Sequence, residues 1–254
     1  MGFILFPVIA LITWAPWYGA ILLVNPLAAR RSHRVALAVT PLACLTLILV
    51  CLERLGARAV RASWPYILMY LGLGAAVLGI SVHLFSFLGI SARDDVLERR
   101  NTAGLVAIIG ALLGATFCFA GGNIGEGPGI AVVIASAGAA LASWFPLWYL
   151  ADRLSGQRIS ERITVERDTG SGIRLGAMLA ASGIILGTAA AGNWIPDRFL
   201  HDFALSAWPA LWLSIAAALG ERLLKPRSSV PVSILVGISY LLVAIAWMFH
   251  RGSA

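Results

Sequence analysis

Residues 98–126 read ERRNTAGLVAIIGALLGATFCFAGGNIGE, and the rest of the chain is interpreted outward from them. The segment starts with a charged flank, passes through an Asn-Thr pair, continues as an apolar span rich in small residues, and ends in a polar, glycine-rich loop. A helix needs about 20 mainly apolar residues to cross the hydrocarbon core of a bilayer. The segment therefore predicts a membrane-spanning helix with polar groups at both ends.

The composition of the whole chain is that of an integral membrane protein. Of its 254 residues, 59% are hydrophobic and 12% are charged, whereas soluble domains carry about 25% charged residues. The net charge of +7 lies mainly in short links between apolar runs, so we interpret it as a signal of membrane orientation and expect no nucleic-acid binding. Cys44, Cys51 and Cys118 have no metal-ligand spacing, and no cofactor is assigned.

Eight apolar runs are long enough to span a membrane. A lipid-exposed backbone must satisfy its own hydrogen bonds, and the runs lack the alternation of barrel strands, so each should be a helix. The predicted fold class is all-α, a polytopic helical membrane protein with about eight transmembrane helices. Residues 1–254 should form one integral membrane domain, divided into a helix pair (1–64), a four-helix core (65–194) and a second pair (195–254). The runs are 3–24, 35–52, 65–90, 103–121, 130–150, 172–191, 206–223 and 230–249.

Basic residues predict that both termini lie outside an inner (plasma) membrane. With the N-terminus outside, 14 basic residues fall in inner links and 5 in outer links, and Lys and Arg favour the cytoplasmic side. The link 53–64 is more basic than an outer link should be. The inner set is Arg30, Arg31, Arg34, Arg93, Arg99, Arg100, Arg153, Arg158, Arg162, Arg167, Arg174, Arg222, Lys225 and Arg227, and the outer set is Arg54, Arg58, Arg61, Arg198 and Arg251.

A second copy of the 98–126 pattern starts about seventy residues later. It begins with Glu-Arg-Asp-Thr at 166–169 and ends with Ala-Gly-Asn-Trp at 191–194. Asn101 and Asp168 open the two spans, and both are residue types that cap helix N-termini. Because both copies have the same predicted orientation, we expect a parallel tandem repeat of a helix hairpin in the middle of the chain.

Small residues recur at helical spacing along both spans of this repeat. Such stripes allow helix backbones to approach closely in lipid. We favour packing within the chain, and the alternative is a face for a homo-oligomer. The stripes comprise Ala103, Ala107, Gly110, Ala111, Gly114 and Ala115 in the first copy, and Gly176, Ala180, Gly183 and Gly187 in the second.

Four features of the chain resemble the YjfL-like family of small bacterial inner-membrane proteins. They are the charged flank, the Asn-Thr-Ala-Gly start at 101–104, the span with Gly110 and Gly114, and the Asp-Thr start at 168–169. The resemblance covers roughly residues 65–194. It implies a four-helix core with a duplicated Asn-Thr-Ala-Ala/Gly helix start. The family has no established activity, so the resemblance implies no catalytic residue. This chain departs from the pattern with Asp168 in place of the second Asn and with an additional helix pair at each end.

Polar residues gather in two links on the predicted outer side. Residues 121–129 contain five glycines around one carboxylate, and glycines permit backbone angles that expose amides. The sequence therefore predicts an outer binding site for a cation or a polar head group, in which Asn123 and Asn193 are equivalent positions. The alternative is a tight turn with a solvated Glu126. The predicted site comprises Asn123, Glu126, Asn193, Asp197 and His201.

Two further polar features have open interpretations. His83 lies within a span, which predicts a proton relay or a ligand; the alternative is a hydrogen bond to a nearby carbonyl. On the inner flank, Asp94 and Asp95 are a carboxylate pair of the kind that holds Mg²⁺ against a phosphate. The alternative there is a solvated, self-neutralising flank.

No catalytic motif supports an enzyme, since the chain contains no H-E-x-x-H, no G-x-S-x-G, no P-loop and no G-x-G-x-x-G after a strand. Three hypotheses remain. The first is a non-enzymatic inner-membrane protein, an oligomeric structural or envelope-assembly component. The second is a small-solute or ion channel or transporter with an outer polar vestibule. The third is an outer-leaflet lipid-modifying enzyme that uses Glu126, Asp197 or His201.

Overall fold

The prediction of an all-α polytopic membrane protein is confirmed. The computed structural model describes residues 2–24, 29–127, 129–156, 158–193, 195, 197–224 and 229–252, and within these ranges it contains helices and one isolated β-bridge but no strand. Eight of the described helices are long and apolar enough to cross a membrane. They are α1 (Gly2–Leu23), α2 (Arg31–Leu55), α4 (Trp64–Phe87), α5 (Thr102–Gly121), α6 (Ile130–Leu154), α8 (Thr169–Ala190), α9 (Phe199–Leu223) and α10 (Val230–Gly252).

Three short helices lie in the links. These are α3 (Arg58–Arg61), the π-helical segment η1 (Ala92–Glu98) and α7 (Ile159–Thr164). Several long helices extend beyond their apolar runs; α8 begins at Thr169 and α9 at Phe199, because helix caps and polar first turns continue a helix past the residues that hydropathy alone selects.

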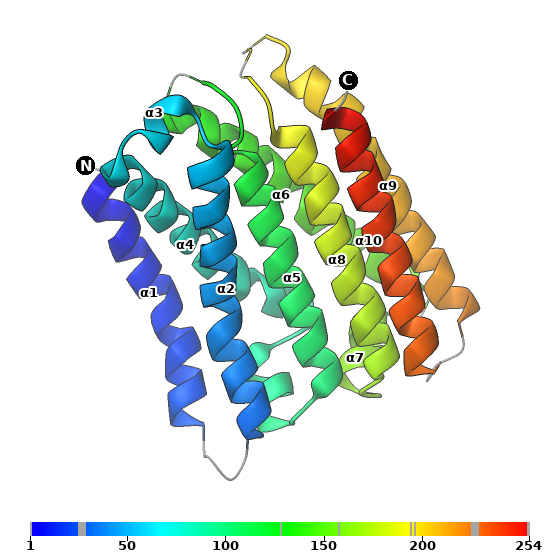
Figure 1. Cartoon of the computed structure of the whole chain (residues 1–254). Helices are drawn as coiled ribbons and strands as arrows, with labels where there is room; N and C mark the ends of the chain where they lie inside the picture. Colours follow the sequence, from blue (N-terminus) through cyan, green and yellow to red (C-terminus); the bar gives the residue numbers. More distant parts are fainter. Residues whose placement is uncertain are drawn as a thin grey trace.

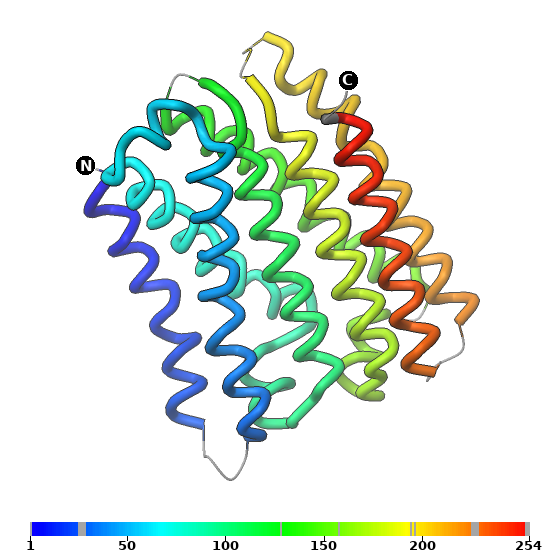
Figure 2. Tube along the Cα trace, viewed as in Figure 1, coloured from blue at the N-terminus to red at the C-terminus, as the bar shows by residue number. Residues whose placement is uncertain are grey.

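The long helices form two layers (Figures 1 and 2). Helices α2, α5, α8 and α10 lie side by side in one layer, and α4, α6 and α9 lie behind them, with α1 packed against α4 at one edge. Helix α1 begins and α10 ends at the same end of the bundle. We call this the glycine-loop end, defined by residues 122–127 and 190–193, and the opposite end the cap end, defined by Asn101 and Asp168.

Helices α5 and α8 touch backbone to backbone along the centre of the bundle. A Cβ atom added to Gly110 or Gly114 would lie less than 3.0 Å from a carbonyl oxygen of α8, and one added to Gly183 or Gly187 would meet a carbonyl oxygen of α5 equally closely. The predicted close packing through these glycines is confirmed. Because the two stripes face each other, they are used within the chain, and the oligomer alternative no longer has their support.

Local backbone features recur at a constant spacing through the middle of the chain. The N-caps Asn101 and Asp168 are 67 positions apart. The backbone N–H of each cap donates 3.0 Å to a carbonyl six residues earlier, that of Asp95 or Arg162. Three pairs of positive φ angles show the same spacing: Gly89 and Gly156 (92° and 85°), Arg100 and Arg167 (55° and 54°), and Gly125 and Gly192 (110° and 125°).

Candidate functional site at the glycine-loop end

A cavity of about 580 Å³ lies at the glycine-loop end, between the first turns of α4 and α6 and beside the start of α9. Its lining is mixed. Met69, Val133 and Phe203 contribute apolar surface, and Tyr70 and Ser136 contribute polar groups. The cavity is therefore amphipathic, and its volume is typical of small-molecule sites, which range over about 300–1,000 Å³.

Aromatic residues bring α4 and α6 together nearer the cap end. The ring centroid of Phe85 lies 6.3 Å from that of Trp144 and 5.4 Å from that of Trp148, and Trp144 Nε1 donates 2.9 Å to the carbonyl oxygen of Leu179 in α8. These large, fully buried side chains fill the space between the helices there. The cavity is consequently confined to the half of α4 and α6 that is nearer the glycine loops.

Loop segments from three links are joined beside the cavity. Gly56 and Ile124 form an antiparallel β-bridge, Gly192 N donates 2.9 Å to Ile124 O, and Glu126 N donates 3.0 Å to Asn193 Oδ1. Gly125 has a φ of 110°, and a Cβ there would collide with the carbonyl of Gly192. Only glycine fits this position without strain.

Three of the five predicted site residues line the cavity: Asn123, Glu126 and Asn193. Asn123 is 5% exposed; its Nδ2 donates 2.7 Å to Phe119 O, and its Oδ1 has no hydrogen-bond partner among the described residues. Glu126 is exposed, and its Oε1 accepts a 2.9 Å hydrogen bond from the first amide of α3, Arg58 N. Glu126 thus stabilises the start of a short helix while its carboxylate borders the cavity.

The other two predicted residues, Asp197 and His201, are not among the lining residues. Both are exposed, and His201 Nδ1 lies 3.3 Å from Asp202 Oδ1. Asp202 borders the cavity instead. Helix α9 begins at Phe199, and residues 199, 202 and 203 lie on the face of its first turn that borders the cavity, whereas His201 lies on another face. Trp194, part of the second sequence copy, lies outside the described residues.

Asn123 and Asn193 are 70 positions apart and so do not share the 67-residue spacing of the caps and glycine turns. Asn123 is buried, whereas Asn193 is exposed and accepts a hydrogen bond from another loop. At the spacing of 67 residues that the caps and glycine turns show, Asn193 corresponds to Glu126, and Asn123 corresponds to Ala190. The two Gly-Asn dipeptides are therefore three residues out of register with that spacing.

His83 lies near the cap end and makes the carbonyl contact that was the alternative interpretation. Its Nε2 donates 2.8 Å to Thr13 O in α1, three residues before Pro16. His83 and Asp94 also line a second cavity, of about 1030 Å³, between α1, α4 and η1.

The carboxylates of Asp94 and Asp95 are engaged within their own flank. Ser91 N donates 2.8 Å to Asp95 Oδ2, and Ser91 Oγ donates 2.9 Å to Asp94 Oδ2. Arg99 Nη1 lies 3.4 Å from Asp95 Oδ1. Among the described residues, no group of three or more His, Cys, Asp or Glu is arranged to hold a metal ion. The geometry fits the self-neutralising flank.

Asn101 and Asp168 cap their helices as predicted. Asn101 Oδ1 accepts hydrogen bonds from Ala103 N at 2.9 Å and Gly104 N at 3.2 Å, and Asp168 Oδ1 accepts one from Gly170 N at 3.0 Å. Asn101 Nδ2 also donates 2.6 Å to the carbonyl of Ile163. The cap residue of α5 therefore also binds α7.

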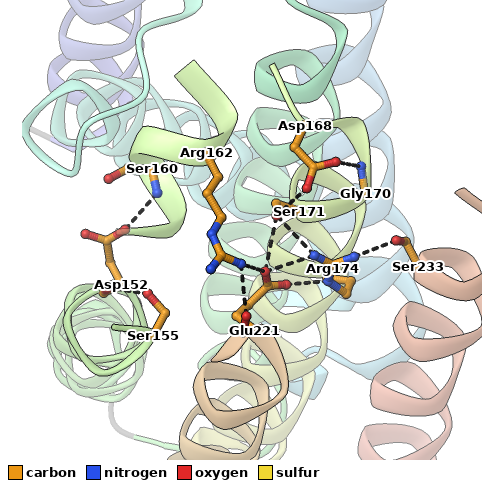
Figure 3. A network of polar contacts seen from close by, with 10 residues as sticks. All are labelled: Asp152, Ser155, Ser160, Arg162, Asp168, Gly170, Ser171, Arg174, Glu221 and Ser233. Atoms are coloured by element: carbon orange, nitrogen blue, oxygen red, sulfur yellow. Dashed lines mark hydrogen bonds and ion pairs between the residues drawn. The ribbon is translucent and has the colours of Figure 1, made fainter. Parts of the chain in front are cut away.

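A buried ion cluster at the cap end was not predicted (Figure 3). Glu221 of α9 lies between Arg162 of α7 and Arg174 of α8. Its Oε2 is 3.3 Å from Arg162 Nη1 and 2.9 Å from Arg174 Nη2, and its Oε1 accepts a further bond from Arg174 Nε. Arg174 and Glu221 are 2% and 3% exposed. We call the set Arg162, Asp168, Ser171, Arg174, Glu221 and Ser233 the Glu221 cluster.

The sequence did contain a signal for this cluster. Arg174 already lies two residues inside the apolar run 172–191, and the Asp168 cap, which starts α8 at Thr169, brings it into the second turn of that helix. Glu221 lies within the last turn of α9. Ionisable residues inside spans need partners, so one Arg and one Glu at the same membrane depth could have been paired.

The described residues thus form an integral membrane bundle with a polar-rimmed cavity at one end and a buried ion cluster at the other. Comparison with protein-family models, with curated proteins and with solved structures gives no match for this chain, so its sites are interpreted from their own geometry.

Proposed function

We propose that this protein binds a small amphipathic solute in the glycine-loop cavity, from the outer side of an inner membrane, and belongs to the transport class. The observation that carries the proposal is the cavity itself, since it collects the polar residues Asn123, Glu126 and Asn193 beside apolar helix surfaces. Pockets that combine apolar side chains with a few placed polar groups are the usual form of solute sites.

The position of the cavity relative to the repeated features supports this proposal. Its lining includes pairs of residues 67 positions apart, such as Tyr66 with Val133, Met69 with Ser136, and Glu126 with Asn193. We take the hairpins α4–α5 and α6–α8 as a tandem duplication, of the kind that the YjfL-like resemblance implies. Solute sites of transporters commonly lie where internal repeats meet.

A second observation favours passage of the solute through the membrane over binding alone. Helix α4 borders the glycine-loop cavity with Met69 and Tyr70, and borders the 1030 Å³ cavity near the cap end with Val82 and His83. A helix that lines one cavity at each end is suited to alternating access, in which one side opens as the other closes.

The other two hypotheses have less support. The hypothesis of an oligomeric structural component was supported by the small-residue stripes, but these stripes pack α5 against α8 within the chain. The hypothesis of a lipid-modifying enzyme depends on Glu126, Asp197 and His201, of which only Glu126 borders the cavity.

The proposed orientation has its own test. It rests on the 14 inner and 5 outer basic residues, of which Lys225 and Arg227 lie outside the described residues. A reporter that is active only outside the cytoplasm should work when fused after residue 254 and should be silent when inserted at the exposed Val165 between α7 and α8. The reverse activity pattern would place the glycine-loop end in the cytoplasm.

Binding is tested with the purified protein in lipid nanodiscs and three compounds that share a benzyl body: benzyltrimethylammonium, neopentylbenzene and phenylmethanesulfonate. Equilibrium dialysis, corrected with empty nanodiscs, should show saturable binding of at least one compound. Ala189 lines the cavity, so Ala189→Trp should abolish that binding by filling the space. Ala216→Trp, on an exposed face of α9, is the matched control and should leave binding unchanged. Equal binding by both variants, or no saturable binding at all, would reject the proposal.

A further inference from the structure

We infer that the solute is an organic cation, with an apolar body and a substituted ammonium group. This inference rests on the proposed function, because it assigns a ligand class to the same cavity. It follows from three independent properties of the lining: aromatic faces, an excess of acceptors, and several loop amides that are already engaged.

Aromatic rings come to the cavity from both α4 and α9. The lining includes Tyr66, Tyr70, Phe199 and Phe203, and the ring centroids of Phe199 and Phe203 lie 5.9 Å apart. Tyr70 is 5% exposed and forms no hydrogen bond with any part of the chain that the structure describes. The negative face of an aromatic ring attracts cations, and rings that line a site from more than one side suit quaternary ammonium groups.

The charged and polar groups of the lining also favour a positively charged ligand. The carboxylates of Glu126 and Asp202 lie at the rim, and among the described lining residues Arg251 alone is basic. His201, beside Asp202, is the nearest further titratable group on α9, and it does not line the cavity. Asn123 adds its side-chain amide oxygen, Oδ1, which accepts no hydrogen bond from the described residues. Acceptors therefore outnumber the cationic donor at the rim.

The glycine-rich loop is poorly suited to an anion, although glycine loops often bind anions through free amides. Asn123 N donates to Ala120 O and Ile124 N donates to Gly121 O, both at 3.0 Å. Glu126 N is taken by Asn193 Oδ1, and Gly192 N by Ile124 O. An anion in the cavity would thus meet two carboxylates while these amides are already engaged.

The test uses the same three compounds, because neopentylbenzene is the neutral isostere of benzyltrimethylammonium and phenylmethanesulfonate carries the opposite charge. The cation should bind about tenfold more tightly than the neutral isostere, the ratio expected for a desolvated cation–π contact. Tyr70→Leu should remove most of that preference, whereas Tyr70→Phe, which keeps the ring, should retain it.

Two carboxylate variants separate charge from folding. Asp202→Asn and Glu126→Gln should each weaken binding of the cation several-fold and leave the neutral compound unaffected. Asp202 is exposed and caps no helix, so Asp202→Asn remains informative if loss of the Glu126 contact to α3 disturbs the loop. Glu161→Gln, at an exposed pair near the cap end, is the control.

The outcomes distinguish this inference from the proposed function. If neopentylbenzene or phenylmethanesulfonate binds as tightly as the cation, and Ala189→Trp abolishes that binding, the cavity is a solute site but the cation inference is overturned. If the binding of no compound responds to Ala189→Trp, the proposed function fails and the inference fails with it. If the cation preference survives both carboxylate variants and Tyr70→Leu, the assigned groups do not recognise the ligand and the inference is also overturned.

Discussion

Two segments that we propose to be tandem copies, residues 64–126 (the first copy) and 131–193 (the second copy), have matching backbone turns but differ at the cap end. In the second copy, Arg162 and Arg174 form a buried cluster with Glu221. The matching positions in the first copy, 67 residues earlier, are Asp95 and Ala107. Capping residues and positive-φ positions recur in both segments, while the charges differ.

This difference corresponds to a difference in packing. The cap end of the second copy is filled by the side chains of the Glu221 cluster, which join α7, α8, α9 and α10 (Figure 3). Beside the first copy, the 1030 Å³ cavity lies between α1, α4 and η1. We therefore expect the second copy to depend on its charges for stability, and the first to tolerate changes there. The following substitutions test that contrast.

Glu221→Gln should have the largest effect. Removing the carboxylate that Arg162 and Arg174 share should lower the free energy of unfolding by about 3–5 kcal/mol, the usual cost of breaking a buried ion pair. Thermal and denaturant unfolding in detergent would measure it. Glu161→Gln, whose pair with Arg158 is exposed and 3.9 Å long, should cost about 0–1 kcal/mol. Equal losses would mean that the Glu221 cluster does not stabilise the second copy.

Gly114→Leu should have the next largest effect, because it forces apart the helices that join the two copies. Its Cβ would meet Leu179 O and the Trp144 ring, and such overpacking costs about 1–3 kcal/mol. Gly138→Leu on α6 is the matched control, since a Cβ there meets nothing within 4 Å. Unfolding measurements that rank the two variants equally would contradict the close α5–α8 contact.

Alanine at the two matching glycine turns should separate strain from steric collision. Gly125 and Gly192 both have positive φ, so either substitution should cost about 1–2 kcal/mol from the backbone conformation. Only at Gly125 would the new Cβ also meet Gly192 O, while Gly192 has nothing within 4 Å. Gly125→Ala should therefore lower the unfolding temperature more than Gly192→Ala, and the opposite order would contradict the loop geometry.

The smallest expected effect concerns Asp95, which stands where the second copy has Arg162. Burial raises the pKa of the Asp95 carboxyl, and the hydrogen bond from Ser91 and the charge of Arg99 offset only part of this shift. The folded protein thus binds the proton more tightly than the unfolded chain, so ionised Asp95 lowers stability at neutral pH. Relative to Asp95→Asn, the wild type should gain stability as the pH falls from 7 towards about 4. A difference that is constant with pH would contradict this assignment.

Features set by local chemistry could be predicted from the sequence. Hydropathy located all eight spans, and the Asn and Asp starts identified both caps because a capping side chain acts only on amides two or three residues away. Close packing at Gly114 and Gly187 was also correct, since glycine stripes have few other uses between apolar helices.

Features that depend on helix placement could not be predicted in the same way. The cavity exists because α4 and α6 meet at Phe85, Trp144 and Trp148 and leave space nearer the loops, and hydropathy contains no information about which helices face each other. Chain position alone groups Asp197 and His201 with the outer polar residues, but the direction of the first turn of α9 decides which of its side chains reach the cavity.

The pairing of Arg174 with Glu221 also has a consequence for membrane insertion of α8 during synthesis. The two residues are 47 positions apart, and ribosomes add about 5–20 residues per second. Arg174 therefore leaves the ribosome about 2–10 s before its partner carboxylate does. During that interval α8 carries an arginine without its partner carboxylate, at a cost below the roughly 2.5–3.5 kcal/mol of the helix centre because Arg174 lies in the second turn. Its insertion should be completed only when α9 follows, so truncation before Glu221 should leave α8 poorly integrated.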